Sequence, residues 1–206
     1  PIISGSTHLR TTEEVPPIEH DCKIHFNGVH YYLLVPFTKK IKKPGNVTRE
    51  CAIDPGSRAF LTLYDPENGC IEIGNNANKV FNKICSRIDR LYSLKAKSSR
   101  KKDKKRIEMK IRKWRLRIQN LRDELHHKAS NFLCKNYSKI CLPRLDTCRM
   151  SRKTPNRKLS SKSVRKMLTL SHPKFFDMTK TKCIDYERVL IEAREEYTTQ
   201  TCSVCG

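Results

Sequence analysis

The chain has 206 residues, of which 37% are hydrophobic and 31% charged. This length excludes a small disulfide-stapled peptide and is typical of one domain or slightly more. No uninterrupted apolar run approaches the roughly 20 residues of a membrane-spanning helix, so we expect a soluble protein with no membrane partner. Lys and Arg total 43 against 21 Asp and Glu, a formal net charge of +22. This excess favours a nucleic-acid partner, the alternative being a merely solvated surface.

The chain opens with two contrasting segments. Residues 1–22 hold three prolines and no hydrophobic period, which predicts a loop or a disordered remnant. Between Lys23 and Val35, Asn27-Gly28 separates two β-prone runs and predicts a hairpin with a type I′ turn, in which both turn residues have positive φ. The basic stretch 39–45 contains Pro and Gly and predicts a boundary between modules.

Three short strand-like segments follow, at residues 50–54, 59–64 and 70–73. The turn residues between them predict a three-stranded meander. Asp54 is expected to be the last residue of the first strand. Pro55, whose φ is fixed, and Gly56 follow it, so we expect the acidic side chain at the point where the chain leaves the strand. Taken alone, Asp-Pro-Gly is equally typical of an ordinary β-turn.

The hydrophobic period then becomes helical. Val80, Ile84, Ile88 and Leu91 fit one helix, and an apolar stripe from Ile107 to Phe132 fits a second, longer one, which together predict an antiparallel pair. Adjacent residues on a helix point about 100° apart, so His126 and His127 are expected to pack or to contact phosphate rather than to bind a metal.

We call residues 95–117, at the tip of this pair, the basic prong. It holds thirteen Lys or Arg against Asp103 and Glu108. A solvated helix face would alternate charges to gain ion pairs, whereas like charges cost stability unless phosphates lie along them. The residues expected to contact nucleic acid are Lys101, Lys102, Lys104, Lys105, Arg106, Lys113 and Arg117.

The last third of the chain predicts a buried strand at 140–145, a basic loop at 147–160, two helices and a final strand at 188–193. Ser160 or Ser161 is expected to cap the first helix, and the second, at 174–186, to bury Phe175 and Phe176. This order of elements predicts a mixed α/β fold rather than two stacked sheets.

Ten cysteines are present, and only Cys202 and Cys205 lie close together. The scattered spacing of the others predicts reduced thiols in an intracellular protein. Two thiolates separated by two residues can bind one tetrahedral Zn²⁺, but they provide only half of its ligands. The alternatives are a redox motif or coincidence.

Four separated blocks, at residues 51–62, 142–147, 167–172 and 195–206, together resemble the TnpB/Fanzor family. Members of this family are transposon-encoded RNA-guided DNA nucleases related to miniature type V CRISPR effectors. The resemblance implies an α/β fold with an RNase H-like (RuvC) mixed sheet at 46–201, into which a long helical hairpin is inserted at 78–137. It further implies the end of a nucleic-acid-binding β-barrel at 23–45 and, at 202–206, the first half of a zinc ribbon.

The resemblance also implies a catalytic site of carboxylates that hold two Mg²⁺ ions. Asp54 matches the first carboxylate, and the second is Glu195, with Asp146 and the adjacent Glu196 as alternatives. Cys202 and Cys205 would bind Zn²⁺. The third carboxylate would follow Gly206, so the isolated polypeptide is expected to be inactive. DNA and guide RNA are the expected partners, in the nucleus of a eukaryotic host or otherwise in the cytoplasm.

Two other functions stay open. The chain could be a catalytically dead nucleic-acid-binding domain that keeps the fold and the basic prong. It could also be a basic structural RNA-binding protein in which Asp-Pro-Gly is only a turn. Convergence of Asp54 and Glu195 at strand ends would exclude this last function.

Overall fold

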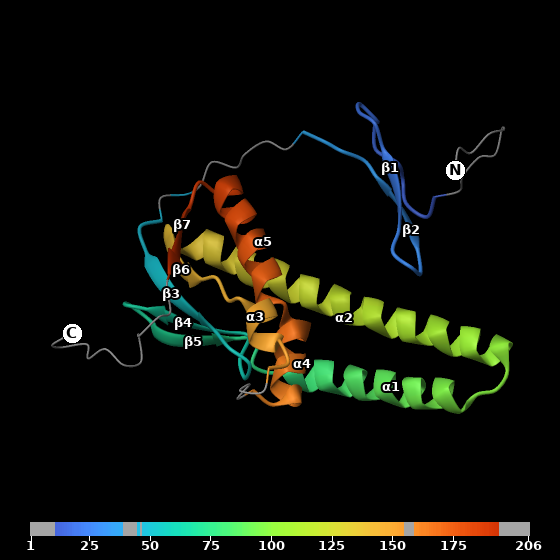
Figure 1. The fold of residues 1–206 in the computed structure, drawn as a ribbon. Coiled ribbons are helices and arrows are strands. Elements are labelled where there is room, and N and C mark those ends of the chain that lie inside the picture. Colours follow the sequence, from blue (N-terminus) through green and yellow to red (C-terminus); the bar gives the residue numbers. More distant parts are fainter. Residues whose placement is uncertain (1–10, 39–44, 46, 155–158, 194–206) are drawn as a thin grey trace. The chain divides into compact units, whose positions relative to one another are not determined.

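A computed structural model of the chain describes residues 11–38, 45, 47–154 and 159–193. It divides the chain into two compact units, residues 1–40 and 41–206, which are described separately (Figure 1). Among the helices of the described residues, none is long and apolar enough to cross a membrane.

The first unit contains a β-hairpin formed by β1 (Lys23–Phe26) and β2 (Tyr31–Leu34). The two strands pair antiparallel, with Phe26 opposite Tyr31, which confirms the predicted hairpin. All eight strand residues are exposed, and the Phe26 and Tyr31 rings stack at 4.5 Å between centroids. The preceding residues 11–22 contain neither helix nor strand.

The predicted type I′ turn is wrong. Four residues, 27–30, connect the strands, and only Gly28 among them has a positive φ, of 90°. The cause is the Asn27 side chain, whose Oδ1 accepts hydrogen bonds from the amides of Val29 and His30 at 3.0 and 2.8 Å. These bonds stabilise a wider loop in which Asn27 keeps a negative φ.

A five-stranded mixed sheet is the centre of the second unit, with the order β5-β4-β3-β6-β7. β3 (Glu50–Pro55), β4 (Leu61–Asp65) and β5 (Gly69–Ile73) form the predicted antiparallel meander. β6 (Lys139–Pro143) pairs parallel with β3, and β7 (Val189–Ala193) pairs parallel with β6. The mixed α/β class is confirmed, and the carboxyl ends of β3, β6 and β7 lie at one edge of the sheet.

Two long helices, α1 (Ala77–Lys97) and α2 (Lys101–Asn136), connect β5 to β6 and run antiparallel to each other (Figure 1). Their seam buries Ile84, Ile88 and Ile111, as the hydrophobic period predicts. Val80 was wrongly placed on this seam, because its side chain is 46% exposed. The buried face of α1 instead contains Asn78 and Phe81, and Phe81 packs into the sheet core.

Three further helices separate β6 from β7. The predicted loop at 147–160 begins instead with a short helix, α3 (Thr147–Ser151). Ser160 caps α4 (Ser161–Leu170) by accepting a hydrogen bond from the Ser163 amide, as predicted. The last helix, α5 (His172–Asp185), starts two residues earlier than expected. It buries both predicted aromatic residues, Phe175 and Phe176.

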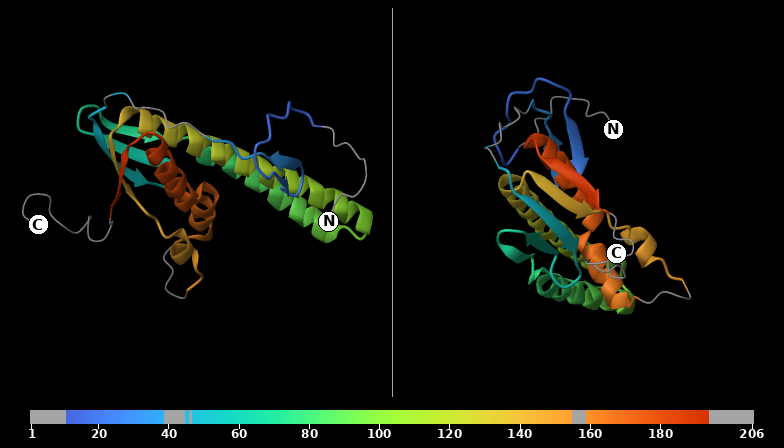
Figure 2. Two further views of the ribbon diagram at one scale, coloured as in Figure 1. Left: turned by 90° about the horizontal axis from the view of Figure 1, so that it is seen from above. Right: turned by 90° about the vertical axis from the view of Figure 1, so that its left-hand side faces the viewer.

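The helices cover one face of the sheet (Figure 2). Alternate strand residues point into this core, where α2 and α5 pack against them. The core residues of the strands are Cys51, Ile53, Leu61, Leu63, Ile140 and Leu142. On the opposite face, Tyr64, Val189 and Ile191 are exposed. Asp54 lies on this open face, because it alternates along β3 with residues that are buried on the core face.

A buried aromatic stack lies where the meander meets the helices. The rings of His126 and His172 are both nearly parallel to the Phe60 ring, with centroids 5.2 and 5.1 Å from it. Both histidines are at most 3% exposed. Gly74 has a φ of 73°, and a β-carbon there would approach the Phe60 Cβ to 2.8 Å. The stack therefore depends on glycine at this position.

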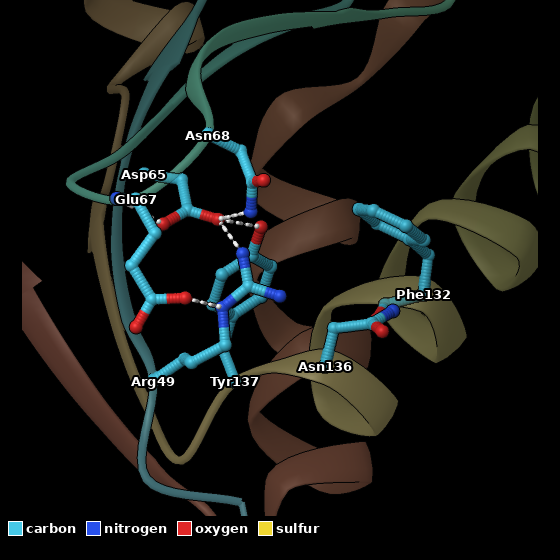
Figure 3. A network of polar contacts seen from close by, with 7 residues as sticks. All are labelled: Arg49, Asp65, Glu67, Asn68, Phe132, Asn136 and Tyr137. Atoms are coloured by element: carbon cyan, nitrogen blue, oxygen red, sulfur yellow. Dashed lines mark hydrogen bonds and ion pairs between the residues drawn. The ribbon is translucent and has the colours of Figure 1, made fainter.

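A polar network fixes the opposite end of the meander (Figure 3). The buried Asp65 carboxylate forms an ion pair with Arg49 and accepts hydrogen bonds from the Tyr137 hydroxyl at 3.0 Å and the Asn68 amide at 2.9 Å. Burial alone would raise the pKa of Asp65, but the Glu67 amide and these donors lower it. Burial and the bond to Asp65 raise the pKa of Tyr137 to about 12. The network joins the start of β3 to the end of α2.

Replacing Gly74 with alanine tests the close contact with Phe60. We expect Gly74→Ala to lower the free energy of unfolding by about 2–3 kcal/mol, because positive φ and steric overlap both oppose it. Gly69→Ala is the matched control: its φ is 72°, but nothing lies within 4 Å of an added β-carbon. It should cost about 1 kcal/mol. Urea-induced unfolding measures both, and equal losses would contradict the packing argument.

The pH dependence of stability tests the histidine stack. Burial lowers the pKa of both His126 and His172 to about 4, against about 6.5 in an unfolded chain. The unfolded chain therefore binds protons first, so stability is complete above about pH 6.5 and falls as the pH approaches 4. The loss should reach about 3 kcal/mol per histidine. Urea titrations between pH 7.5 and 4.5 measure it. His127→Gln, which alters an exposed neighbour, should leave the profile unchanged.

Candidate metal site and nucleic-acid interface

The sheet brings the carboxyl ends of three strands to one edge. Asp54 is the penultimate residue of β3, and Asp146 follows β6 by three residues. Glu195 follows the last residue of β7 by two positions in the sequence, although it lies outside the described residues. In open α/β sheets, ligands bind outside the carboxyl ends of strands where the chain leaves in opposite directions. β3 and β6 are neighbours that meet this condition. The strand after β3 in the chain, β4, lies on one side of the pair, and the strand after β6, β7, lies on the other.

The Asp54 carboxylate is exposed on the open face of the sheet. Within the described part of the chain it has neither a hydrogen bond nor an ion pair, whereas Asp65 is buried and fully bonded. An uncommitted carboxylate offers hard oxygen ligands of the kind that Mg²⁺ prefers. Asp54 and Pro55 are paired strand residues, opposite Thr62 and Leu61, so the simple β-turn interpretation of Asp-Pro-Gly is wrong.

Asp146 has a structural task. It is the N-cap of α3, and its Oδ1 accepts a hydrogen bond from the Arg149 amide at 2.9 Å. N-capping aspartates stabilise helices by satisfying amides of the first turn. One carboxylate oxygen of Asp146 is thus committed to the backbone, which distinguishes it from Asp54. An aspartate immediately before a helix is a typical start signal in sequence, and Asp146 precedes α3 directly.

Several of the predicted ligands lie outside the described residues. They are Glu195, Glu196, Cys202 and Cys205. Among residues 11–38, 45, 47–154 and 159–193, no three His, Cys, Asp or Glu side chains lie close enough to share a metal ion. The described chain therefore contributes Asp54 to the candidate site, and the convergence of Asp54 with Glu195 stays a prediction.

The basic prong occupies the end of α1 and the first half of α2 (Figure 1). All seven residues predicted to contact nucleic acid are exposed. None of them forms an ion pair with another described residue. The inward-facing Glu108 is instead bound by Lys95 at 2.5 Å and lies 3.7 Å from Arg112. The outer charges of the prong are therefore not neutralised by ion pairs with other described residues.

The start of α2 also opposes its own helix dipole. Lys101 and Lys102 open the helix, where the partial positive charge of the free amides favours acidic side chains, and only Asp103 is acidic in the first turn. This arrangement costs stability unless an anion lies nearby. Exposed cations without ion-pair partners among the described residues therefore gather at the start of α2.

The helical histidines have separate environments. His126 is fully buried against Phe60, and its Nε2 lies 2.8 Å from the Leu170 carbonyl oxygen. His127, the next residue of α2, is exposed. The predicted packing role is confirmed for His126. His172 is also buried, and its Nε2 contacts the Gly56 carbonyl oxygen next to the Asp54 segment. The sequence gives no signal for this contact, because it joins residues more than a hundred positions apart.

A groove lies between α2 and α4. It has a volume of about 440 Å³ and is lined by Arg115, Arg122 and Arg165 over an apolar floor that includes Ile118 and Val164. Arg165 is already engaged, since its guanidinium binds both oxygens of Asp89 at 2.6 and 2.7 Å. No local signal predicts this groove, because its walls come from distant segments.

Comparison with known proteins identifies the family. The family model described as "Probable transposase" (OrfB_IS605) matches residues 31–154. The model "Cas12f1-like, TNB domain" matches residues 172–206. In the solved structures, a chain of a CRISPR-Cas12f ternary complex aligns with a TM-score of 0.46 and 16% identity, over 85% of this chain and 34% of the other.

Relatives occur in a giant virus. The TnpB-like protein L79 of Acanthamoeba polyphaga mimivirus is 32% identical over 210 residues, which cover all of this chain and 39% of the relative. TnpB-like protein L770 of the same virus is 32% identical over 180 residues, 85% of this chain and 34% of the relative. The chain thus spans little more than a third of the length of these relatives. The chain belongs to the TnpB family of transposases.

Proposed function

We propose that this chain supplies the metal-binding sheet edge and a nucleic-acid-binding surface of a transposon-encoded, RNA-guided DNA endonuclease. The observation that carries the proposal is the exposed, uncommitted Asp54 carboxylate at the edge shared by the carboxyl ends of β3, β6 and β7. An antiparallel meander extended by two parallel strands supports an RNase H-like (RuvC) domain. Membership of the TnpB family supports the reaction class.

The donor set fits Mg²⁺ in part. Asp54 provides hard oxygen ligands from the described residues, and Glu195, which follows β7 in the sequence, is the proposed second carboxylate. Asp146 is the less suitable alternative, because it caps α3. When bound, two Mg²⁺ ions activate a water molecule and stabilise the leaving oxygen of a phosphodiester. The protein's own contribution is to hold Asp54 at a fixed strand end beside the nucleic-acid backbone.

The basic prong is the proposed contact with DNA and guide RNA. Its seven exposed cations lack ion-pair partners among the described residues, and a phosphate backbone would neutralise them. Such a surface reads backbone and shape, while base pairing between guide and target supplies sequence specificity. We also propose that Cys202 and Cys205 bind Zn²⁺ as two of its four ligands.

Mn²⁺ binding tests the metal site, because this ion substitutes for Mg²⁺ and broadens nearby NMR signals. We expect Mn²⁺ to broaden the amide signals of Ile53, Asp54 and Gly56, and Asp54→Asn to weaken the apparent affinity at least tenfold by removing a charged ligand. Glu195→Gln should weaken it as well, whereas Asp146→Asn should not. Glu72→Gln is the control, since Glu72 is an exposed acid on the same sheet face. Equal broadening in Asp54→Asn and Glu72→Gln would contradict the proposed site.

Salt-dependent binding tests the prong. We expect replacement of Lys101, Lys102, Lys104 and Lys105 by glutamine to reduce the slope of log affinity for duplex DNA against log salt by about 3 to 4, because each phosphate contact contributes roughly 0.9. The matched control replaces four other exposed lysines, Lys79, Lys83, Lys135 and Lys180, with the same change in net charge. Fluorescence anisotropy between 50 and 300 mM salt compares the two. A similar change in both variants would mean that binding follows net charge alone.

A catalytically inactive nucleic-acid-binding domain is the second candidate. It is favoured by the exposed prong, whose charges do not depend on the acidic residues. The two measurements separate the candidates, because such a domain would keep the salt dependence and show no binding of Mn²⁺ that depends on Asp54.

A further inference from the structure

Side chains from two helices hold the loop that follows Asp54 and Pro55. This loop, residues 56–60, is closed by a hydrogen bond from the Gly56 amide to the Phe60 carbonyl at 3.1 Å. From α1, the Asn78 side-chain amide donates to the carbonyls of Ser57 and Arg58 at 2.6 and 3.1 Å. From α5, the His172 Nε2 lies 3.2 Å from the Gly56 carbonyl oxygen. The backbone immediately beyond Asp54 is therefore fixed from outside the sheet.

His172 makes the contact that lies closest to Asp54 in the sequence. A carbonyl oxygen only accepts hydrogen bonds, so the His172 Nε2 must carry the hydrogen and donate it to Gly56. The ring is 3% exposed and stacks on Phe60, the residue at the other end of the same loop. Its Nδ1 is buried without a hydrogen-bond partner among the described residues. The single polar interaction found for this buried ring is thus the one with Gly56.

His126 provides a natural comparison. It also stacks on Phe60, at nearly the same distance and angle as His172, and its Nδ1 likewise lacks a described partner. Its Nε2, however, bonds to the carbonyl of Leu170 at the end of α4. The two histidines therefore share burial and stacking, and they differ in whether the N–H reaches the Asp54 segment.

We propose that His172 is a positioning residue for Asp54. By holding the Gly56 carbonyl and one face of Phe60, it fixes the end of β3 from which the Asp54 carboxylate projects. This inference rests on the proposed metal site at Asp54. Backbone support is needed because no described residue bonds to the carboxylate itself, and metal ligands require orientation by groups behind them. Gly56, which has no side chain of its own, cannot lock this turn by packing.

Three variants separate positioning from core packing. His172→Phe keeps an aromatic ring on Phe60 and removes the donor to Gly56. His126→Phe makes the same change in the other ring that stacks on Phe60, but leaves Gly56 bonded. His172→Gln is the conservative variant. The glutamine side-chain amide Nε2 can reach the position of the histidine Nε2 and donate to the Gly56 carbonyl. Unfolding in urea at pH 7.5 reports the stability of each variant and selects conditions in which all are folded.

Two measurements on the whole chain test the inference. Hydrogen exchange of the Gly56 and Phe60 amides, without metal, reports the order of the loop. Broadening by Mn²⁺ at Ile53, Asp54 and Gly56 reports the site. We expect His172→Phe to accelerate loop exchange and to weaken apparent Mn²⁺ affinity about tenfold, the lower range for residues that orient ligands. His126→Phe should change neither, and His172→Gln should restore both.

The outcomes distinguish this inference from the proposed function. If the unaltered chain binds no Mn²⁺ in an Asp54-dependent manner, the proposed metal site is wrong, and the positioning role for a metal ligand is overturned with it. If the site binds Mn²⁺ but His172→Phe and His126→Phe behave alike, the site stands and the role of His172 is overturned. Loss of binding in His172→Phe without restoration by His172→Gln would also overturn it, because the hydrogen bond would then not be the cause.

Discussion

The parallel pairing of β3 with β6 and of β6 with β7 is the constraint on which the rest of the structure depends. Parallel neighbours cannot be joined by a tight turn, so the chain must cross over between them. It does so twice, first through the meander and the long α1–α2 pair, and then through α3, α4 and α5. Both crossovers return the chain to the edge at which β6 and β7 begin, so β3, β6 and β7 all end at the opposite edge. That edge is where Asp54 projects and where the sequence continues beyond β7.

The meander contains two aspartates in opposite environments, the buried Asp65 and the exposed Asp54. Asp65 is surrounded by donors, and its lowered pKa follows from the bonds to Glu67, Arg49 and Tyr137. A group so fully bonded stabilises the junction of β3 and α2 and has little left to offer a ligand. Asp54, on the open face, has none of these contacts from described residues. The contrast separates a structural acid from a candidate ligand better than sequence position does.

The basic prong shows a similar separation of stability from function. The apolar seam of α1 and α2 is sufficient to hold the two helices together. The surplus of Lys and Arg on their outer faces adds repulsion and opposes the dipole of α2. Natural helices that need only solubility mix their charges. This repulsion is the physical reason for the proposed polyanionic partner, whose phosphates would neutralise these cations.

Much of the architecture could be predicted from the sequence, because hydrophobic periodicity and capping residues act locally. The meander, the helix pair, the Ser160 cap and the final strand all follow from residues within a few positions of one another. The errors also have local causes. Asn27 uses its side chain to widen the hairpin loop, and Phe81 rather than Val80 faces the core because one residue on a helix turns the face by 100°.

The positive charge of the prong, the strand that carries Asp54 and most of the order of elements can be derived from the residues in chain order. The folded structure was needed to show that Asp65 is buried in a network and that His172 reaches Gly56. These contacts join segments that are distant in the chain, or depend on which atoms a side chain finds after folding. Periodicity reports which face of an element is buried, but it carries no information about the partner across the core.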